Sequence, residues 1–116
     1  MDPFIERHRE ALAELCRRHR VRRLDLFGSA ALDAFDPARS DLDFLVTFEE
    51  MSPREHADAY FGLLADLRSL FGRPVDLVEE GAIRNPYFRE SVERTRNAVY
   101  GRRDATIGIP PENSMK

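Results

Sequence analysis

The sequence predicts an α/β fold, because stretches with the apolar period of a helix alternate with short apolar runs that are typical of strands. With 116 residues, the chain has room for one domain with a single modest core. We expect this domain to span residues 1–100. Polar, Gly and Pro residues follow no period over 101–116, which predicts a loosely structured C-terminal tail.

The first part of the chain predicts a helix, a strand and a second, short helix. Asp2 can cap the first helix, in which apolar side chains recur at helical spacing as far as Cys16. Residues 21–27 follow as a strand and end at a Gly-Ser turn, and a short helix is expected over about 29–34. The side chains of the strand alternate between an apolar and a charged face: Leu24 and Leu26, then Arg23 and Asp25.

The second part predicts two strands and two helices. A strand is expected over about 41–48, and Ser52-Pro53-Arg54-Glu55 then has the pattern of a capping box that begins a long amphipathic helix ending at Gly72. Residues 74–78 form a short apolar strand, and Asn85-Pro86 can begin a last helix. The apolar positions assigned to that helix are Phe88, Val92 and Val99.

Composition excludes several classes of protein. The formal net charge of −3 argues against generic DNA binding, which depends on neutralising many phosphates. The single cysteine, Cys16, cannot form an intramolecular disulfide and is expected to be a buried structural thiol. No charged leader and no apolar run of ~20 residues is present, so we expect no membrane span and a cytoplasmic protein.

The histidines and a group of arginines have simple structural interpretations. His8, His19 and His56 share no metal-ligand spacing, so we expect surface or packing roles for them. The arginines near the end of the first helix favour a solvated face, with a docking patch for an acidic partner or RNA as the alternative. They are Arg17, Arg18, Arg20, Arg22 and Arg23.

Two carboxylates in the second strand predict a metal site. Asp41 and Asp43 project from the same face of the strand, where like charges repel unless a cation lies between them. Alone, such a pair could equally be solvated, but two features accompany it. The Gly28-Ser29 turn allows a phosphate close to the backbone, and Asp76 is an isolated charge in an apolar strand. Together they indicate Mg²⁺ and phosphoryl or nucleotidyl transfer.

The ordered set Phe27-Gly28-Ser29, Ser40-Asp41-Leu42-Asp43 and Val75-Asp76-Leu77-Val78 resembles the minimal nucleotidyltransferases of the DNA polymerase beta superfamily. Those small proteins act as antitoxins beside HEPN-domain toxins. The resemblance implies a nucleotidyltransferase palm, an α+β fold with a small mixed sheet and helices packed on one face. It also implies transfer of AMP from ATP to a hydroxyl acceptor, such as a HEPN toxin partner. A chain this short is expected to complete its site with that partner or as a homo-oligomer.

The resemblance assigns roles to individual residues. Asp41, Asp43 and Asp76 are the catalytic residues and the ligands of two Mg²⁺ ions, which would clamp the attacking and leaving oxygens of an in-line displacement. Gly28, Ser29 and Ser40 would bind the phosphates of the nucleoside triphosphate.

The chain departs from the family pattern after the Gly-Ser turn, which leaves other functions open. Family members carry an Arg-Gly pair there, whereas this chain has Ala30-Ala31-Leu32-Asp33, in a connector one residue longer than usual. Arg39 could partly replace the missing arginine. The departure favours a second hypothesis, a non-catalytic antitoxin that neutralises a HEPN ribonuclease by occlusion. A third hypothesis, modification of a small molecule such as an antibiotic, is disfavoured because such enzymes carry additional substrate-binding structure.

Overall fold

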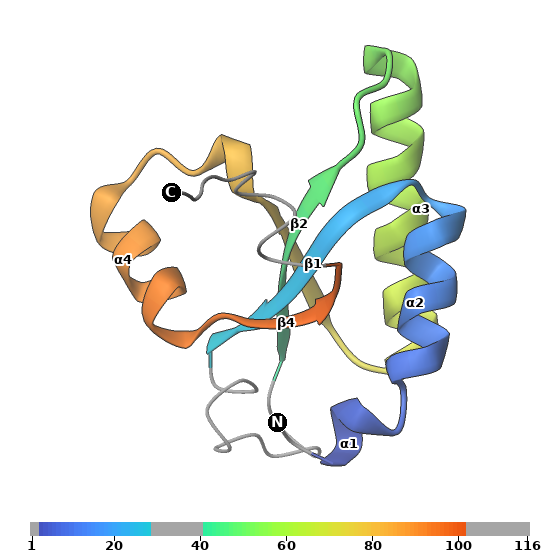
Figure 1. The fold of residues 1–116 in the computed structure, drawn as a ribbon, viewed down its shortest axis with the longest axis horizontal. Coiled ribbons are helices and arrows are strands. Elements are labelled where there is room, and N and C mark those ends of the chain that lie inside the picture. Colours follow the sequence, from blue (N-terminus) through green and yellow to red (C-terminus); the bar gives the residue numbers. More distant parts are fainter. Residues whose placement is uncertain (1–2, 29–40, 102–116) are drawn as a thin grey trace, which may run out of the picture.

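The computed structural model describes residues 3–28 and 41–101, which form a four-stranded mixed sheet and its helices (Figure 1). The strand order is β3-β2-β1-β4; β2 and β3 are parallel, and both other pairs are antiparallel. This confirms the predicted α/β class and mixed sheet. In chain order the elements are α1 (Pro3–Glu6), α2 (Arg9–Arg18), β1 (Val21–Phe27), β2 (Leu42–Phe48), α3 (Pro53–Phe71), β3 (Val75–Glu79), the 3₁₀ turn η2 (Glu80–Ala82), α4 (Pro86–Thr95) and β4 (Asn97–Tyr100).

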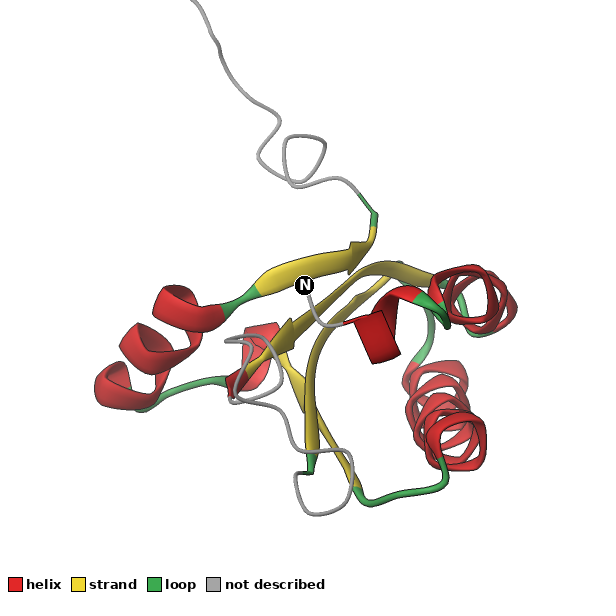
Figure 2. Cartoon of the chain, turned by 90° about the horizontal axis from the view of Figure 1, so that it is seen from below, coloured by secondary structure: helices red, strands yellow, loops and turns green. Residues whose placement is uncertain are grey.

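The main core lies between the sheet and the two longer N-terminal helices. Figure 2 shows α2 and α3 together on one side of the sheet, as expected, whereas α4 lies on the other side and not on the one face predicted for the helices. Alternate side chains of β1 and β2 point into the main core, in agreement with the predicted faces. Its fully buried members include Leu12, Leu24, Leu26, Leu42, Phe44, Leu63 and Leu67. A smaller cluster of Phe27, Leu45 and Val92 connects α4 to the opposite face.

The predicted limits of α3 are confirmed by its caps. The Ser52 hydroxyl accepts from the Glu55 backbone N–H at 3.2 Å, and the Glu55 carboxylate accepts from the Ser52 N–H at 3.0 Å. These two bonds satisfy donors that a helix leaves free at its N-terminus. The helix ends at Gly72, whose φ of +64° is the left-handed conformation that glycine adopts without strain.

The edge strand β3 is held by side chains of α3 as well as by β2. The Tyr60 hydroxyl donates to the Leu77 carbonyl at 2.6 Å, and the Arg68 guanidinium donates to the Val75 carbonyl at 3.3 Å. An edge strand otherwise presents unpaired backbone groups. The helix therefore fixes the strand that carries Asp76.

The predicted first helix is interrupted. It divides into α1 and α2 around His8, whose side chain bonds the Phe4 carbonyl at 2.8 Å. The Phe4 ring lies against both His8 and Phe71. Packing against the end of α3 therefore outweighs the continuous helical period of the sequence.

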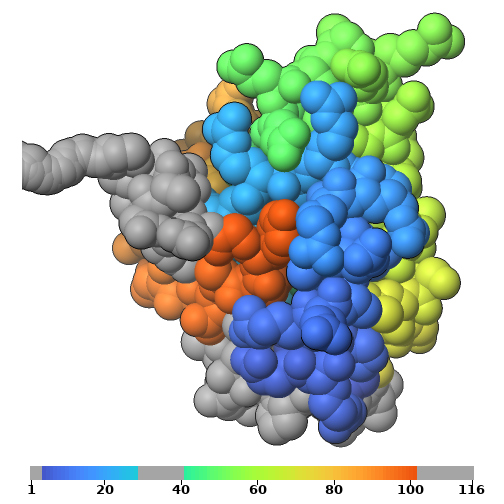
Figure 3. All heavy atoms as spheres, turned by 45° about the vertical axis from the view of Figure 1, so that its right-hand side comes forward, coloured from blue at the N-terminus to red at the C-terminus, as the bar shows by residue number. Residues whose placement is uncertain are grey.

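The prediction that Val99 belongs to the last helix is wrong. The helix ends at Thr95, and Val99 lies in β4, where it is buried. Val92 and Val99 are seven residues apart, a spacing that fits one helix face, but tertiary pairing decides the conformation here. Strand β4 pairs with β1 and lies beside α2 at the surface (Figure 3).

The remaining structural predictions have mixed outcomes. Cys16 is buried as expected, and burial raises the pKa of its thiol to about 12. Each histidine contacts a polar group within the fold: besides His8, His19 lies 2.6 Å from the Asp66 carboxylate and His56 2.5 Å from that of Glu79.

Arg23 was wrongly placed on a solvated face, because it is only 6% exposed. No helix in residues 3–28 or 41–101 is long and apolar enough to span a membrane.

Candidate active site

Asp43 and Asp76 form the centre of the candidate site. They are opposite each other in the parallel pair of β2 and β3, on the sheet face turned away from α2 and α3. Asp43 is half-buried and Asp76 is exposed. Burial first, and then the neighbouring Asp76 and Asp41 carboxylates, together raise the pKa of Asp43 to about 6. The pair is therefore a place where negative charge accumulates without a cation.

Gly28 provides the space in which the Asp43 carboxylate lies. Its φ of +77° suits a glycine, and a Cβ added there would lie 2.8 Å from Oδ2 of Asp43. The sequence predicts that this turn offers N–H groups to a phosphate, but the N–H of Gly28 itself donates to the Thr95 hydroxyl at 3.0 Å. In this structure, Gly28 contributes room and close approach, and Thr95 of α4 anchors the turn.

The other predicted site residues are placed less centrally or are not described. Asp41 is exposed just before β2, on the same side as Asp43. Ser29 and Ser40, with Arg39, the predicted helix over 29–34 and the Ala30–Asp33 loop, lie outside the described residues. Among the residues that are described, no three histidine, cysteine or carboxylate side chains gather as a ready-made metal site. Two adjacent carboxylates still fit Mg²⁺, which takes one or two of them and completes its shell with water and phosphate oxygens.

A hollow of about 350 Å³ adjoins the two carboxylates along the free edge of β3, between α3 and α4. It is lined by Phe27, Asp43, Tyr60, Leu64, Arg68, Val75, Asp76, Leu77, Val78 and Phe88. A larger hollow of about 440 Å³, around Glu49, His56 and Glu79, contains none of the predicted site residues. We place the site in the smaller hollow, because only there do the opposed carboxylates meet a concave surface.

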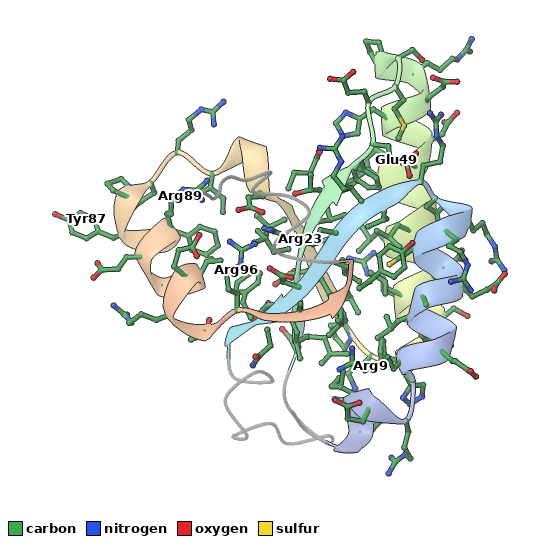
Figure 4. All side chains as sticks on the ribbon, viewed as in Figure 1. Arg9, Arg23, Glu49, Tyr87, Arg89 and Arg96 are labelled. Carbon is green, nitrogen blue, oxygen red and sulfur yellow. The ribbon has the colours of Figure 1, made fainter. Side chains whose placement is uncertain are left out.

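A network of buried charges connects α4 to the sheet next to the site. The Arg96 guanidinium donates to the Asp25 carboxylate at 2.7 Å and to both oxygens of Glu80 at 3.0 Å. Arg23 donates to Glu80 at 2.6 Å. In Figure 4, Arg23, Arg89 and Arg96 converge between α4 and the sheet.

The charges of this network are maintained by their partners. Burial alone would raise the pKa of Glu80, but Arg96 and Arg23 outweigh it and lower that pKa below its usual 4.5. Burial likewise opposes the charge on Arg96, while Glu80 and Asp25 raise the pKa of the guanidinium above its ordinary value. The network thus fixes α4, and through Thr95 the turn at Gly28, against β1.

Sequence reasoning missed the residues that α4 contributes. Phe88 was assigned to the last helix as an apolar position beside Val92 and received no role at the site, although it lines the hollow. No role was predicted for Arg96 and Glu80, because each is a polar residue in a polar segment of the sequence. The available signal was the charged face of β1, because Arg23 and Asp25 require buried counter-charges once that face is covered.

Comparisons with known proteins agree on one family. The family model described as "Nucleotidyltransferase domain" matches residues 8–99. Two curated relatives come from Methanocaldococcus jannaschii. The protein named "Putative protein adenylyltransferase MJ0128" is 36% identical over 90 residues, 78% of this chain and 85% of the relative. Its counterpart MJ1379, with the same description, is 30% identical over the same shares of both chains.

Solved structures share the fold. One described as "Structure of putative minimal nucleotidyltransferase" is 39% identical, with a TM-score of 0.60, and covers 79% of this chain and 89% of its own. A toxin–antitoxin structure with AMP-PNP has a TM-score of 0.64 at 21% identity and covers 84% and 76%. The tri-AMPylated Shewanella oneidensis HEPN toxin with MNT antitoxin gives 0.62 at 18% identity, covering 88% and 76%. At those last two identities the likeness concerns the fold alone.

Proposed function

The chain belongs to the nucleotidyltransferase domain family, and from that premise we propose that it transfers AMP from Mg²⁺-bound ATP to a hydroxyl of a HEPN-type toxin partner. The observation that carries the proposal is the opposition of Asp43 and Asp76 across the parallel strands, beside Gly28 and an open hollow. The carboxylates of this site can bind a metal–phosphate complex. Among the residues that the structure describes, the site presents no other group that favours a different class of reaction.

Each residue has a distinct part in the proposed reaction. Asp43 and Asp76 would hold Mg²⁺, with Asp41 on the same face as a further oxygen donor. The acceptor oxygen would bond to the α-phosphorus as pyrophosphate leaves, and the metal would supply neutralisation of the phosphates and of the charge that develops on that leaving group. Asp76 is the more exposed of the opposed pair, so an acceptor hydroxyl can approach it and lose its proton there. Gly28 keeps the space around Asp43 free of a side chain.

The proposed partner rests on the proteins that accompany similar folds in solved structures. Structures that share this fold include a complex of an MNT antitoxin with a HEPN toxin that carries AMP, and another toxin–antitoxin structure with an ATP analogue. The curated relatives are named as adenylyltransferases of proteins, which supports a protein as the acceptor. We extend both features to this chain as part of the proposal.

Ligand-dependent stabilisation tests the nucleotide site. At a hundredfold excess over the dissociation constant, ATP with Mg²⁺ should stabilise the chain by ~2.7 kcal/mol. Asp43→Asn should remove that gain in a thermal melt. Asp58→Asn, the same change at an exposed position of α3, is the matched control and should keep it. Equal melting midpoints with and without the ligand in the unchanged protein would reject a nucleotide site.

Label transfer tests the reaction itself. With α-labelled ATP and the HEPN-type partner, label should appear on the partner, and Asp41→Asn combined with Asp43→Asn should abolish both the transfer and the neutralisation of the toxin.

The altered loop Ala30–Asp33 favours a second candidate function, neutralisation by occlusion alone. In that case the double variant still protects cells from the toxin, because small polar substitutions leave the docking surface intact. Leu32→Arg, which restores the usual arginine of the family, should raise transfer if the chain is catalytic and change nothing if it only binds.

A further inference from the structure

The hollow beside Asp43 and Asp76 has two chemically different parts. The carboxylates form the polar part. Phe27, Val78 and Phe88 form an apolar part on the same face of the sheet, since Phe27 is opposite Asp43 in the β1–β2 pair and Val78 follows Asp76 by two residues. A ligand that fills both parts must combine an anionic group, held at the carboxylates through a cation, with a flat or apolar group. A nucleoside triphosphate has this combination.

Phe88 is fixed in place but not covered. Its ring lies 5.9 Å from that of Phe27 at an angle of 78°, and Phe27 is itself buried with Leu45 and Val92. The Asn85 side chain accepts from the Phe88 N–H at 3.2 Å and so caps the turn that carries it. Even so, 39% of Phe88 stays exposed, which is unusual for a phenylalanine packed on a core cluster. Phe88 also lines the hollow.

We infer that Phe88, supported by Phe27, is the surface on which the base of the nucleotide stacks while its phosphates lie at Asp43 and Asp76. This inference rests on the proposed function and adds a subsite to it. Stacking on an aromatic ring contributes to binding for any base, because every base has a π-face. Phe88 is thus assigned to affinity for the nucleotide and not to the transfer step.

The same surface predicts weak discrimination between bases. Phe27, Leu64, Val78 and Phe88 offer no side-chain hydrogen bond with which to read the edge of a base. The polar side chains at the other border, Tyr60 and Arg68, already donate to carbonyls of β3. A pocket of this kind distinguishes ligands by contact area, so we expect ATP and GTP to bind within about threefold of each other and pyrimidine triphosphates to bind more weakly.

The test compares two ligands that differ only in the nucleoside. The affinity of the full chain for ATP with Mg²⁺, and for inorganic tripolyphosphate with Mg²⁺, is measured by titration calorimetry. Phe88→Ala should weaken ATP binding about tenfold and leave tripolyphosphate unchanged. Phe88→Leu keeps an apolar side chain without the flat ring and should also weaken ATP alone, while Phe88→Tyr should retain the affinity. Tyr87→Ala is the matched control, because Tyr87 is 81% exposed, does not line the hollow and points outward from α4 (Figure 4).

The outcomes separate this inference from the proposed function. Unchanged ATP binding in Phe88→Ala, or an equal loss of both ligands, overturns the base subsite and leaves the phosphate site standing. The same applies if the unchanged protein binds tripolyphosphate as tightly as ATP. Failure to bind either ligand rejects the proposed function and the subsite with it. If Tyr87→Ala loses ATP affinity to the same extent, the base lies on a different surface of α4.

Discussion

The two faces of the sheet differ in chemistry although the same strands build both. Towards α2 and α3, β1 and β2 present leucines and Phe44, which are fully buried. Towards α4 they present the charged Arg23, Asp25 and Asp43, together with a small apolar group of Phe27 and Leu45. The alternation of side chains in a strand makes such a division possible in one layer of backbone.

The difference shows how the fold tolerates an unfavourable site. Each large apolar side chain buried on the α2–α3 face contributes about 1.5–3 kcal/mol of hydrophobic stabilisation. The α4 face contains paired charges at one end and the opposed Asp43 and Asp76 at the other. The apolar face therefore offsets a cost that the site face imposes. Substitutions on each face can measure this division.

The largest effect is expected on the apolar face. Phe44 is fully buried and stacks on Phe71 with ring centroids 6.0 Å apart. Phe44→Ala should lower the free energy of unfolding by about 3–5 kcal/mol, because it leaves a cavity as well as losing burial. Urea denaturation measures the change, with Phe61→Ala as the control at a position that is 65% exposed. A loss below about 1 kcal/mol would contradict the importance of this face.

The next effect concerns the charge network on the α4 face. Arg96→Met leaves the buried Asp25 carboxylate with the Arg23 guanidinium, 3.9 Å away and shared with Glu80, as its remaining ion-pair partner among the described residues, so we expect a loss of about 3 kcal/mol. Arg94→Met removes an exposed i,i+4 pair of the same helix and should change stability by less than about 0.5 kcal/mol. If both variants melted alike, the buried network would contribute nothing beyond a surface ion pair.

A smaller effect, and one that depends on pH, is expected at Glu80. Glu80→Gln should cost about 2 kcal/mol at neutral pH by weakening hydrogen bonds to charged groups. The folded-state pKa of Glu80 is depressed, so its contribution is complete above the ordinary value of 4.5 and is lost as the pH falls through the lower folded value. The stability difference between the variant and the unchanged protein should thus narrow in acid. Denaturation curves at pH 7 and pH 3.5 test this, and a constant difference would exclude the linkage.

The smallest effect has the opposite sign and lies in the site. Without metal, Asp43→Asn should stabilise the chain at pH 8 by about 1 kcal/mol, a figure reduced because the side chain is only half-buried. The pKa of Asp43 is raised from its ordinary 3.8 to about 6, so the penalty of the wild-type carboxyl develops as the pH rises from 3.8 to 6, and the gain in Asp43→Asn should shrink below pH 6 and vanish below pH 3.8. Asp41→Asn, at an exposed position, should change little. Melts in the presence of a chelator are the measurement, and a destabilised Asp43→Asn would show that the carboxylates do not conflict.

Local sequence patterns predicted much of the fold and of the difference between the two faces of the sheet. The bounds of β1 agree with the prediction because its side chains alternate clearly and the strand ends at a glycine. The bounds of α3 agree because the residues that cap each end of the helix are close to that end in the sequence. Alternation predicts that Asp41 and Asp43 share one face, whereas the position of Asp76 in a neighbouring strand was implied by the family resemblance. Strand β4 was missed because its four residues carry little pattern and acquire their conformation from β1.

Contacts between distant segments account for what the sequence could not predict in the site. The pairing of Arg96 with Asp25 and Glu80 joins three separate segments of the chain, and no spacing of residues in the sequence predicts it. Phe88 and Val92 share one apolar period, yet Val92 is buried with Phe27 and Leu45 whereas Phe88 borders the hollow. Periodicity identifies a face of a helix but not the extent of its neighbour.

The parallel register that opposes Asp43 and Asp76 also bears on the order in which the chain folds. Strands β1 and β2 are sequential and antiparallel, whereas the β2–β3 pair forms only through a crossover, here α3. Pairings that close longer loops form later, after local contacts have compensated their entropy. The two carboxylates would meet in the step that docks α3 on the sheet, when its apolar face becomes available to offset their repulsion. A nascent chain arrested before residue 75 would therefore carry β1 and β2 free of that repulsion.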